Sequence, residues 1–329
     1  MEMGDPEVKD QQEMFQESRR CSRQHPQRQP KGRGISAVVS IILSPRKGLR
    51  TNCTSAMKHK RSNAEPTQEE IQWALAIKQA ALDHADTAEA AANMTDLEFL
   101  QHGIIAKDSI DKALVRIKRL QAFKERYGIQ GDGSYDNGFR DILAFIQSFP
   151  AFLTGLGVAT DGAQVVCYDF SQYRVRSIHT DEAYAVCMRA FFYTLQAAQC
   201  NIDAIRSGVR LLGDFEGLGW ENFSVNAEKR AAELYNNCYP MRVTEMALMQ
   251  ANPLIRVFYS ILKVFISKKL ARVFTMPSRR KEFLNAHKSL YPAEALPEAW
   301  GGKQTGAIVG ELFGKKLKER YDTASRIKL

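Results

Sequence analysis

Long apolar runs are missing from this chain. A membrane-spanning helix is predicted only from about 18 apolar residues in a row, and no segment of the 329-residue sequence reaches that length. A transmembrane anchor is therefore not expected. Hydrophobic residues still make up 44% of the chain and charged residues 25%, as in ordinary globular proteins, so a sizeable core can be buried.

The usual spacings of metal ligands are also missing. The six cysteines include no C-x-x-C pair, and no two of the six histidines have H-x-x-x-H spacing. Because zinc sites are commonly built on such closely spaced ligands, no metal is predicted. Four of the cysteines fall in segments expected to be core, which favours reduced, buried thiols and a cytoplasmic protein.

Motifs of the common enzyme classes are absent as well. The sequence has no G-x-S-x-G elbow and no G-x-x-x-x-G-K-[ST] loop. The glycine-rich segment 213–219 follows a predicted strand, but Asp214 and Glu216 bring negative charge to the place where a phosphate would bind. No catalytic residue and no cofactor is predicted. An enzyme that acts on small molecules with the carboxylates near Asp214 is the alternative hypothesis.

Positive charge is concentrated at the start of the chain. Residues 1–61 hold 13 Lys and Arg against 6 Asp and Glu, a net charge of +7, which leaves +2 of the total +9 for the rest. That near-neutral remainder does not predict a nucleic-acid partner. Residues 1–56 lack helical or strand periodicity and are predicted to be a disordered basic leader. Two alternatives stay open, a targeting signal around the apolar residues 35–43 and an extension upstream of Met57.

Helical periodicity characterises residues 67–130. Thr67-Gln-Glu-Glu70 has the sequence pattern of a helix N-terminal capping box. A longer helix is predicted from Ser109 to Tyr127, with apolar side chains on one side, basic side chains on the other and Gly128 as its C-cap. The sequence predicts a small N-terminal helical domain.

Strand and helix patterns alternate over residues 140–302. Helices are predicted for residues 180–200 and 224–238, and strands for residues 164–169, 208–213, 243–250 and 272–276. This alternation predicts an α/β fold with a mostly parallel sheet. Residues 303–329 are predicted to be a basic tail that holds a short amphipathic helix near 312–321.

Residues 252–269 carry more apolar side chains than a surface helix needs. The apolar run is about a dozen residues long, shorter than the roughly 20 that cross a bilayer, and it ends at Ser267-Lys-Lys269. Two interpretations remain. The segment is either a buried core helix or a helix that covers an apolar cavity and meets a membrane surface.

Five motifs stand in order along the chain: Ala113–Gly128, Gly208–Gly219 with its Asp-x-x-Gly, Asn237-Cys-Tyr-Pro240 followed by Arg242, the apolar segment 252–269, and Leu296-Pro-Glu-Ala-Trp-Gly-Gly302. Together they resemble the CRAL-TRIO (Sec14-like) family of lipid-binding proteins, in which the segment 252–269 has the place of the gate helix, and the pattern is most similar to the tocopherol-transfer branch of that family. The resemblance covers residues 70–302.

The resemblance implies a helical domain followed by an α/β domain whose sheet floors an apolar pocket closed by the gate helix. It also implies a hydrophobic ligand, either a phospholipid, a tocopherol-like molecule or another isoprenoid, and transfer of this ligand between membranes without catalysis. The residues expected in the pocket and gate are Tyr184, Phe191, Leu254, Val257, Phe258, Ile261, Leu262 and Phe265.

Basic residues beside the gate are implied to contact anionic lipid headgroups, including phosphoinositides. Arg242 and Lys269 match two positions of that site in the tocopherol-transfer branch, and Lys268 and Arg272 lie next to them. The expected partners are therefore the lipid ligand and an anionic membrane surface. A monomer that associates peripherally with membranes is predicted.

The sequence also departs from the family's phosphatidylinositol binders. Gln101, Met241 and Leu270 stand where those proteins have Arg, an acidic residue and Thr. The alternative within the same family is a regulatory or scaffold module that senses lipid without transferring it.

Overall fold

The computed structural model describes most of the chain after residue 64. The described residues are 65–106, 109–129, 135–149, 151–178, 180–222, 224–235, 238–253, 255–256, 259 and 267–329. Residues 57–329 form one compact unit. The predictions for residues 1–56, and those for Leu254, Val257, Phe258, Ile261, Leu262 and Phe265, lie outside the described residues.

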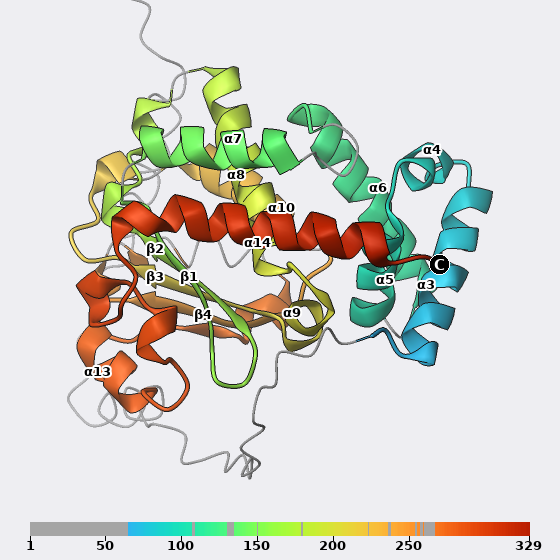
Figure 1. Ribbon diagram of the computed structural model, residues 1–329. Helices are drawn as coiled ribbons and strands as arrows, with labels where there is room; N and C mark the ends of the chain where they lie inside the picture. Colours follow the sequence, from blue (N-terminus) through green and yellow to red (C-terminus); the bar gives the residue numbers. More distant parts are fainter. Residues whose placement is uncertain are drawn as a thin grey trace, which may run out of the picture. The chain divides into compact units, whose positions relative to one another are not determined.

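Four helices follow one another at the start of the described chain: α3 (Gln68–Asp83), α4 (Ala88–Ala92), α5 (Asp96–Ile105) and α6 (Ile110–Arg126) (Figure 1). The capping box predicted at Thr67 is present, since the Thr67 hydroxyl accepts from the Glu70 amide and the Glu70 carboxylate accepts from the Thr67 amide. Thr95 caps α5 in the same way. Apolar residues of α3, α5 and α6 share one buried cluster.

A five-stranded sheet follows, with the order β1-β2-β3-β4-β5. The strands are β1 (Leu153–Val158), β2 (Gln164–Asp169), β3 (Val209–Asp214), β4 (Val243–Met249) and β5 (Phe274–Thr275). β1 pairs with β2 antiparallel, and the other neighbours are parallel. The predicted α/β fold with a mostly parallel sheet is confirmed. Strand β1 was not predicted, because Gly155 and Gly157 interrupt the apolar pattern of a strand.

The remaining helices are α7 (Tyr135–Ser148), α8 (Asp181–Ala198), α9 (Ile202–Ser207), α10 (Val225–Tyr235), α12 (Lys268–Ala271), α13 (Arg280–Ala286) and α14 (Gly306–Arg326), with short 3-10 turns at Phe170–Gln172, Val175–Ser177, Trp220–Asn222, Ala293–Ala295 and Glu298–Trp300.

The two faces of the sheet are covered differently. Leu211 of β3 packs in the core with α7, α8 and α14, whereas its neighbour Leu212 packs with α13. This alternation follows from the two-residue period of a strand.

The C-terminal helix α14 is longer and more buried than the predicted helix at 312–321. It runs alongside α7 and α8 in Figure 1, and Val309, Phe313 and Leu317 are almost fully buried. These three residues recur at helical spacing, so one face of α14 belongs to the main core. The predicted tail is therefore largely an ordered helix.

A buried polar network ties α14 to the rest of the fold. The Arg320 guanidinium donates to the Gln199 carbonyl and to the Gln101 side chain. The Gln101 amide in turn donates to the Gln199 side chain at 2.9 Å and to the Pro240 carbonyl at 2.6 Å. Gln101 thus connects α5, α14 and the turn before β4.

Within the part of the chain that the structure describes, no helix is long and apolar enough to cross a bilayer.

Candidate functional site

An apolar cavity of about 150 Å³ lies on the sheet face opposite α13. Eight aromatic side chains line it: Tyr168, Phe170, Tyr173, Phe191, Phe215, Tyr235, Tyr259 and Phe274. The other lining residues are Leu211, Gly213, Leu218, Asn222, Ala231, Ala232, Met246, Leu248, Ile255 and Leu270. Among these described residues none carries a charge.

The floor of the cavity follows from strand geometry. Leu211 and Gly213 on β3, and Met246 and Leu248 on β4, are two residues apart and face the same side of the sheet. Gly213 gives room to the aromatic rings, because a Cβ there would come within 2.9 Å of both Phe215 and Phe170.

The loop after β3 closes one end of the cavity. The Phe170 and Phe215 rings stack with their centroids 4.3 Å apart. The Asn222 side chain accepts from the Gly219 amide and donates to the Ser171 carbonyl, each at 2.8 Å. Asn222 therefore holds the loop and is not free to act on a ligand.

Tyr168 is one of four tyrosines in the cavity wall. Its side chain is only 4% exposed. Burial raises the pKa of Tyr168 well above its ordinary value, and the neighbouring Tyr235 raises it further. The phenol therefore stays protonated and uncharged at neutral pH.

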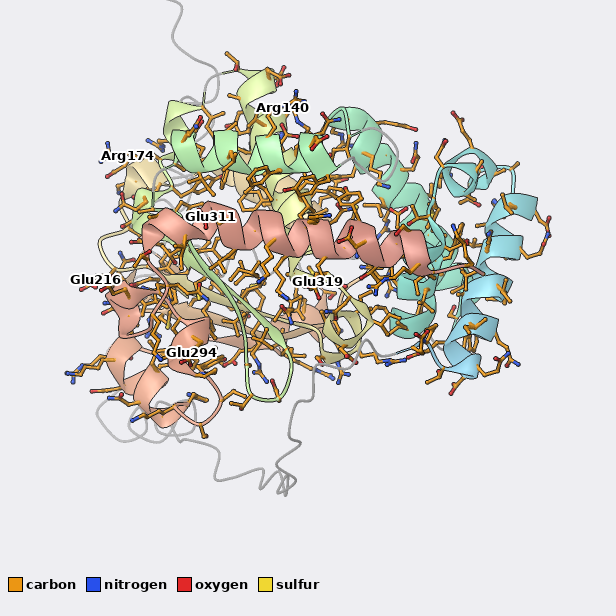
Figure 2. All side chains as sticks on the ribbon, in the orientation of Figure 1. Arg140, Arg174, Glu216, Glu294, Glu311 and Glu319 are labelled. Carbon is orange, nitrogen blue, oxygen red and sulfur yellow. The ribbon has the colours of Figure 1, made fainter. Side chains whose placement is uncertain are left out.

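The carboxylates after β3 are engaged in structural contacts. Asp214 is 2% exposed and forms an ion pair with Arg280 of α13. The Gln250 side chain donates to Asp214 at 3.0 Å and to Glu216 at 2.8 Å. Figure 2 shows Glu216 at the surface. These contacts join the ends of β3 and β4 to α13, as expected for carboxylates that fix a loop.

A second, more polar cleft of about 980 Å³ adjoins the cavity, and Tyr235 and Leu270 line both. Its other lining residues are Glu70, Ile104, Ile105, Arg116, Arg206, Tyr239, Met241, Arg242, Val243, Thr244, Ser267 and Val273. Arg206 donates two hydrogen bonds to the Glu70 carboxylate, which lowers the pKa of Glu70 to about 2. This pair links α3 to α9.

The structure brings the predicted headgroup residues to one region. Arg242 is exposed and lines the polar cleft together with Ser267 and Leu270. Lys268 and Arg272 are exposed, whereas Leu270 between them is 8% exposed and faces the cavity. The side chain of Lys269, also predicted, is outside the described part.

The two aromatic residues predicted for the pocket have different places. Phe191 lines the cavity, but Tyr184 does not. Tyr184 shares the face of α8 with Phe191 but lies seven residues earlier, which is about 10 Å along a helix. There the Arg230 guanidinium lies 4.7 Å from the centre of its ring.

Most of the cavity wall was not predicted from the sequence. Tyr168, Phe170 and Phe215 come from the ends of strands and from the following loops. The period of two along residues 164–169 would have placed Val166 and Tyr168 on one face, but it does not tell which face carries the cavity.

Comparisons with known proteins agree with this architecture. Residues 160–302 match the CRAL/TRIO domain. The human alpha-tocopherol transfer protein-like is 22% identical over 245 residues, which are 72% of this chain and 68% of that protein. The human and mouse tyrosine-protein phosphatase non-receptor type 9 are 27% identical over 119 residues, or 36% of this chain. This chain spans about a fifth of those phosphatases, 19% of their length.

Among solved structures, the crystal structure of Sfh5 has a TM-score of 0.46 at 10% identity, covering 73% of this chain and 89% of that one. The matched region of the present chain is a domain of the lipid-binding and transfer type. Residues 160–302 are therefore assigned to the CRAL/TRIO domain that the sequence motifs predicted.

Proposed function

We propose that the protein binds one hydrophobic lipid in the apolar cavity and transfers it between membranes while docked on an anionic surface. The observation that carries the proposal is the cavity itself, which has eight aromatic side chains and no charged one among its described lining residues. Burial of a lipid in such a site contributes about 0.8 kcal/mol for each CH₂ removed from water. The function requires no covalent step.

The volume of the cavity bears on how a lipid would enter. A cavity of about 150 Å³ is similar in size to one that holds a benzene molecule, so a longer ligand requires displacement of the segments that cover it. We assign this covering role to the predicted gate residues Leu254, Val257, Phe258, Ile261, Leu262 and Phe265. Phe191 contributes to the inner wall.

The arrangement around α12 supports surface docking. Lys268 and Arg272 are exposed on either side of Leu270, which faces the cavity, and exposed Arg242 lies in the adjoining cleft. Each basic residue near an anionic leaflet contributes about 1 kcal/mol of attraction. With Lys269 they form the proposed headgroup site, which includes phosphoinositides among its targets. Ligand exchange would then occur next to the membrane.

Lipid analysis and a transfer assay test the proposal. We expect the full-length protein, purified without detergent, to carry stoichiometric lipid detectable by mass spectrometry. We also expect it to move that lipid from donor to acceptor vesicles. Protein that carries no lipid and takes none from vesicles would contradict the proposal. Binding without transfer would favour the lipid-sensing alternative.

A further inference from the structure

The N-terminal helices bury a histidine that the proposed function does not use. His102 lies on α5 and is 0% exposed. Neither of its ring nitrogens has a hydrogen-bond partner among the residues that the structure describes. Buried polar groups are nearly always paired in folded proteins. A fully buried imidazole without a partner therefore requires a physical explanation.

The surroundings of His102 oppose its protonation. Burial, and then the positive charge of Arg116 on α6, lower the pKa of His102 from its ordinary 6.5 to about 3. Lys124 of α6 acts in the same direction, and only Glu98, one turn earlier on α5, opposes these cations. That carboxylate is already engaged, because it accepts from the Lys124 ammonium and from the Thr95 amide, each at 2.9 Å. The buried imidazole is therefore neutral at pH 7.

The other helices packed against α5 are α3, α9 and α14. Their charged groups on this side are bound to partners of their own: Glu70 and Asp203 to Arg206, Lys78 to Asp96, and Arg320 to Gln101. A protonated His102 would find no uncommitted carboxylate among them.

Helices α5 and α6 also form part of the wall of the polar cleft. Ile104 and Ile105 follow His102 on α5 and line this cleft, as does Arg116 of α6. Apolar residues of both helices hold them in one buried cluster. A separation of α5 from α6 that lets water reach His102 would therefore widen the cleft, which adjoins the apolar cavity.

We propose that His102 makes the α5–α6 wall of the polar cleft acid-sensitive, because its imidazole takes up a proton only when the two helices separate and proton uptake then holds them apart. The pKa of His102 is lower in the closed state than in the open one. Its contribution to closure is therefore complete above about pH 6.5 and is lost progressively as the pH falls toward 3.

The consequence for lipid exchange rests on the proposed function. An anionic leaflet with a surface potential of about −30 mV attracts protons and lowers the pH at its surface by about half a unit. Docking on such a surface would thus favour opening of the cleft at the place where the lipid is exchanged.

Hydrogen–deuterium exchange of the full-length protein, without added lipid, measures this opening. After correction for the intrinsic pH dependence of exchange, the protection of the α5 and α6 amides should fall about 25-fold between pH 7 and pH 5, as linkage to an open-state pKa of 6.5 requires. These amides should also exchange faster than those of the central strand β3 at each pH. Equal protection of α5, α6 and β3 would mean that only global unfolding exposes His102, and it would overturn the inference.

Two substitutions of His102 remove the titrating group. His102→Leu is apolar and similar in size, and His102→Gln is the second variant in case the first does not fold. In each, the fall in protection between pH 7 and pH 5 should shrink to less than about 3-fold. His84→Gln is the matched control, because His84 is the exposed C-cap of α3, and it should keep the fall seen in wild type.

The outcomes separate this inference from the proposed function. A fall that persists in the His102 variants would overturn the inference, while lipid found on the purified protein by mass spectrometry would leave the proposed function intact. A fall that depends on His102 in a protein that neither carries nor takes up lipid would support the acid-sensitive wall and contradict the proposed function.

Discussion

At the residue scale, the structure assigns roles that depend on partners distant in sequence. Glu70 was expected as part of a capping box, and it has that role. It also binds Arg206, 136 residues away, through two hydrogen bonds. Gln101 and Arg320 meet in the same way across the fold. The local sequence predicts the cap, because Thr67 and Glu70 are only three residues apart. It does not predict the ion pair, whose partners are far apart in the sequence.

The Glu70–Arg206 pair predicts a pH-dependent stability. The pKa of Glu70 is about 2 in the folded protein and 4.5 ordinarily, so the pair stabilises the fold fully above about pH 4.5 and this contribution is lost as the pH falls toward 2. Glu70→Gln, which keeps a capping side chain, should lower the free energy of unfolding at pH 7 by about 2–3 kcal/mol. Urea unfolding of both proteins measures this.

The exposed neighbour Glu69 provides the control. Glu69→Gln should change the free energy of unfolding by less than about 0.5 kcal/mol. The difference between wild type and Glu70→Gln should shrink between pH 4.5 and pH 2. A difference that is the same at pH 7 and pH 3 would show that the pair does not act through the Glu70 charge.

At the element scale, the main difference from expectation concerns α14. Its basic composition suggested a tail with a short helix, because residues 303–329 hold seven Lys and Arg against three Asp and Glu. The apolar residues Val309, Phe313 and Leu317 are few, but they recur every four residues and pack against α7 and α8. Three well-placed apolar side chains decide the position of this helix more than its net charge does.

Truncation of Phe313 tests whether α14 belongs to the core. Phe313 is fully buried, so Phe313→Ala should reduce the free energy of unfolding by about 3–5 kcal/mol. Lys315→Ala, at an exposed position two residues on, should have an effect below about 0.5 kcal/mol. Chemical denaturation measures both. Equal stability of the two variants would mean that α14 does not pack as described.

At the scale of the whole molecule, the basic residues around α12 and the apolar cavity lie next to each other. Leu270 joins them, because it lines both the cavity and the polar cleft, whereas Lys268 and Arg272 are exposed. A membrane that attracts these residues would therefore be close to the cavity. This proximity, and not the total charge of the protein, is what the proposed docking requires.

Charge-reversal variants distinguish the effect of the basic residues at α12 on membrane binding from the effect of the protein's net charge. The triple variant Lys268→Glu, Lys269→Glu and Arg272→Glu should reduce flotation with anionic liposomes at least tenfold, since each residue contributes about 1 kcal/mol. The same change at exposed Lys315, Lys318 and Lys328 alters the net charge equally and should have a smaller effect. Equal losses in both variants would argue against a docking site at α12.

The sequence by itself determined the class of fold, the N-terminal helices, most strands and the CRAL/TRIO domain, because periodicity, caps and ordered motifs are local properties of the chain. It also predicted Phe191, which lines the cavity. Only the tertiary structure decided which aromatic side chains line the cavity, that Tyr184 lies outside it, and that α14 joins the core. The physical reason is that a cavity is formed by residues from several strands and loops, and their meeting depends on how the elements pack.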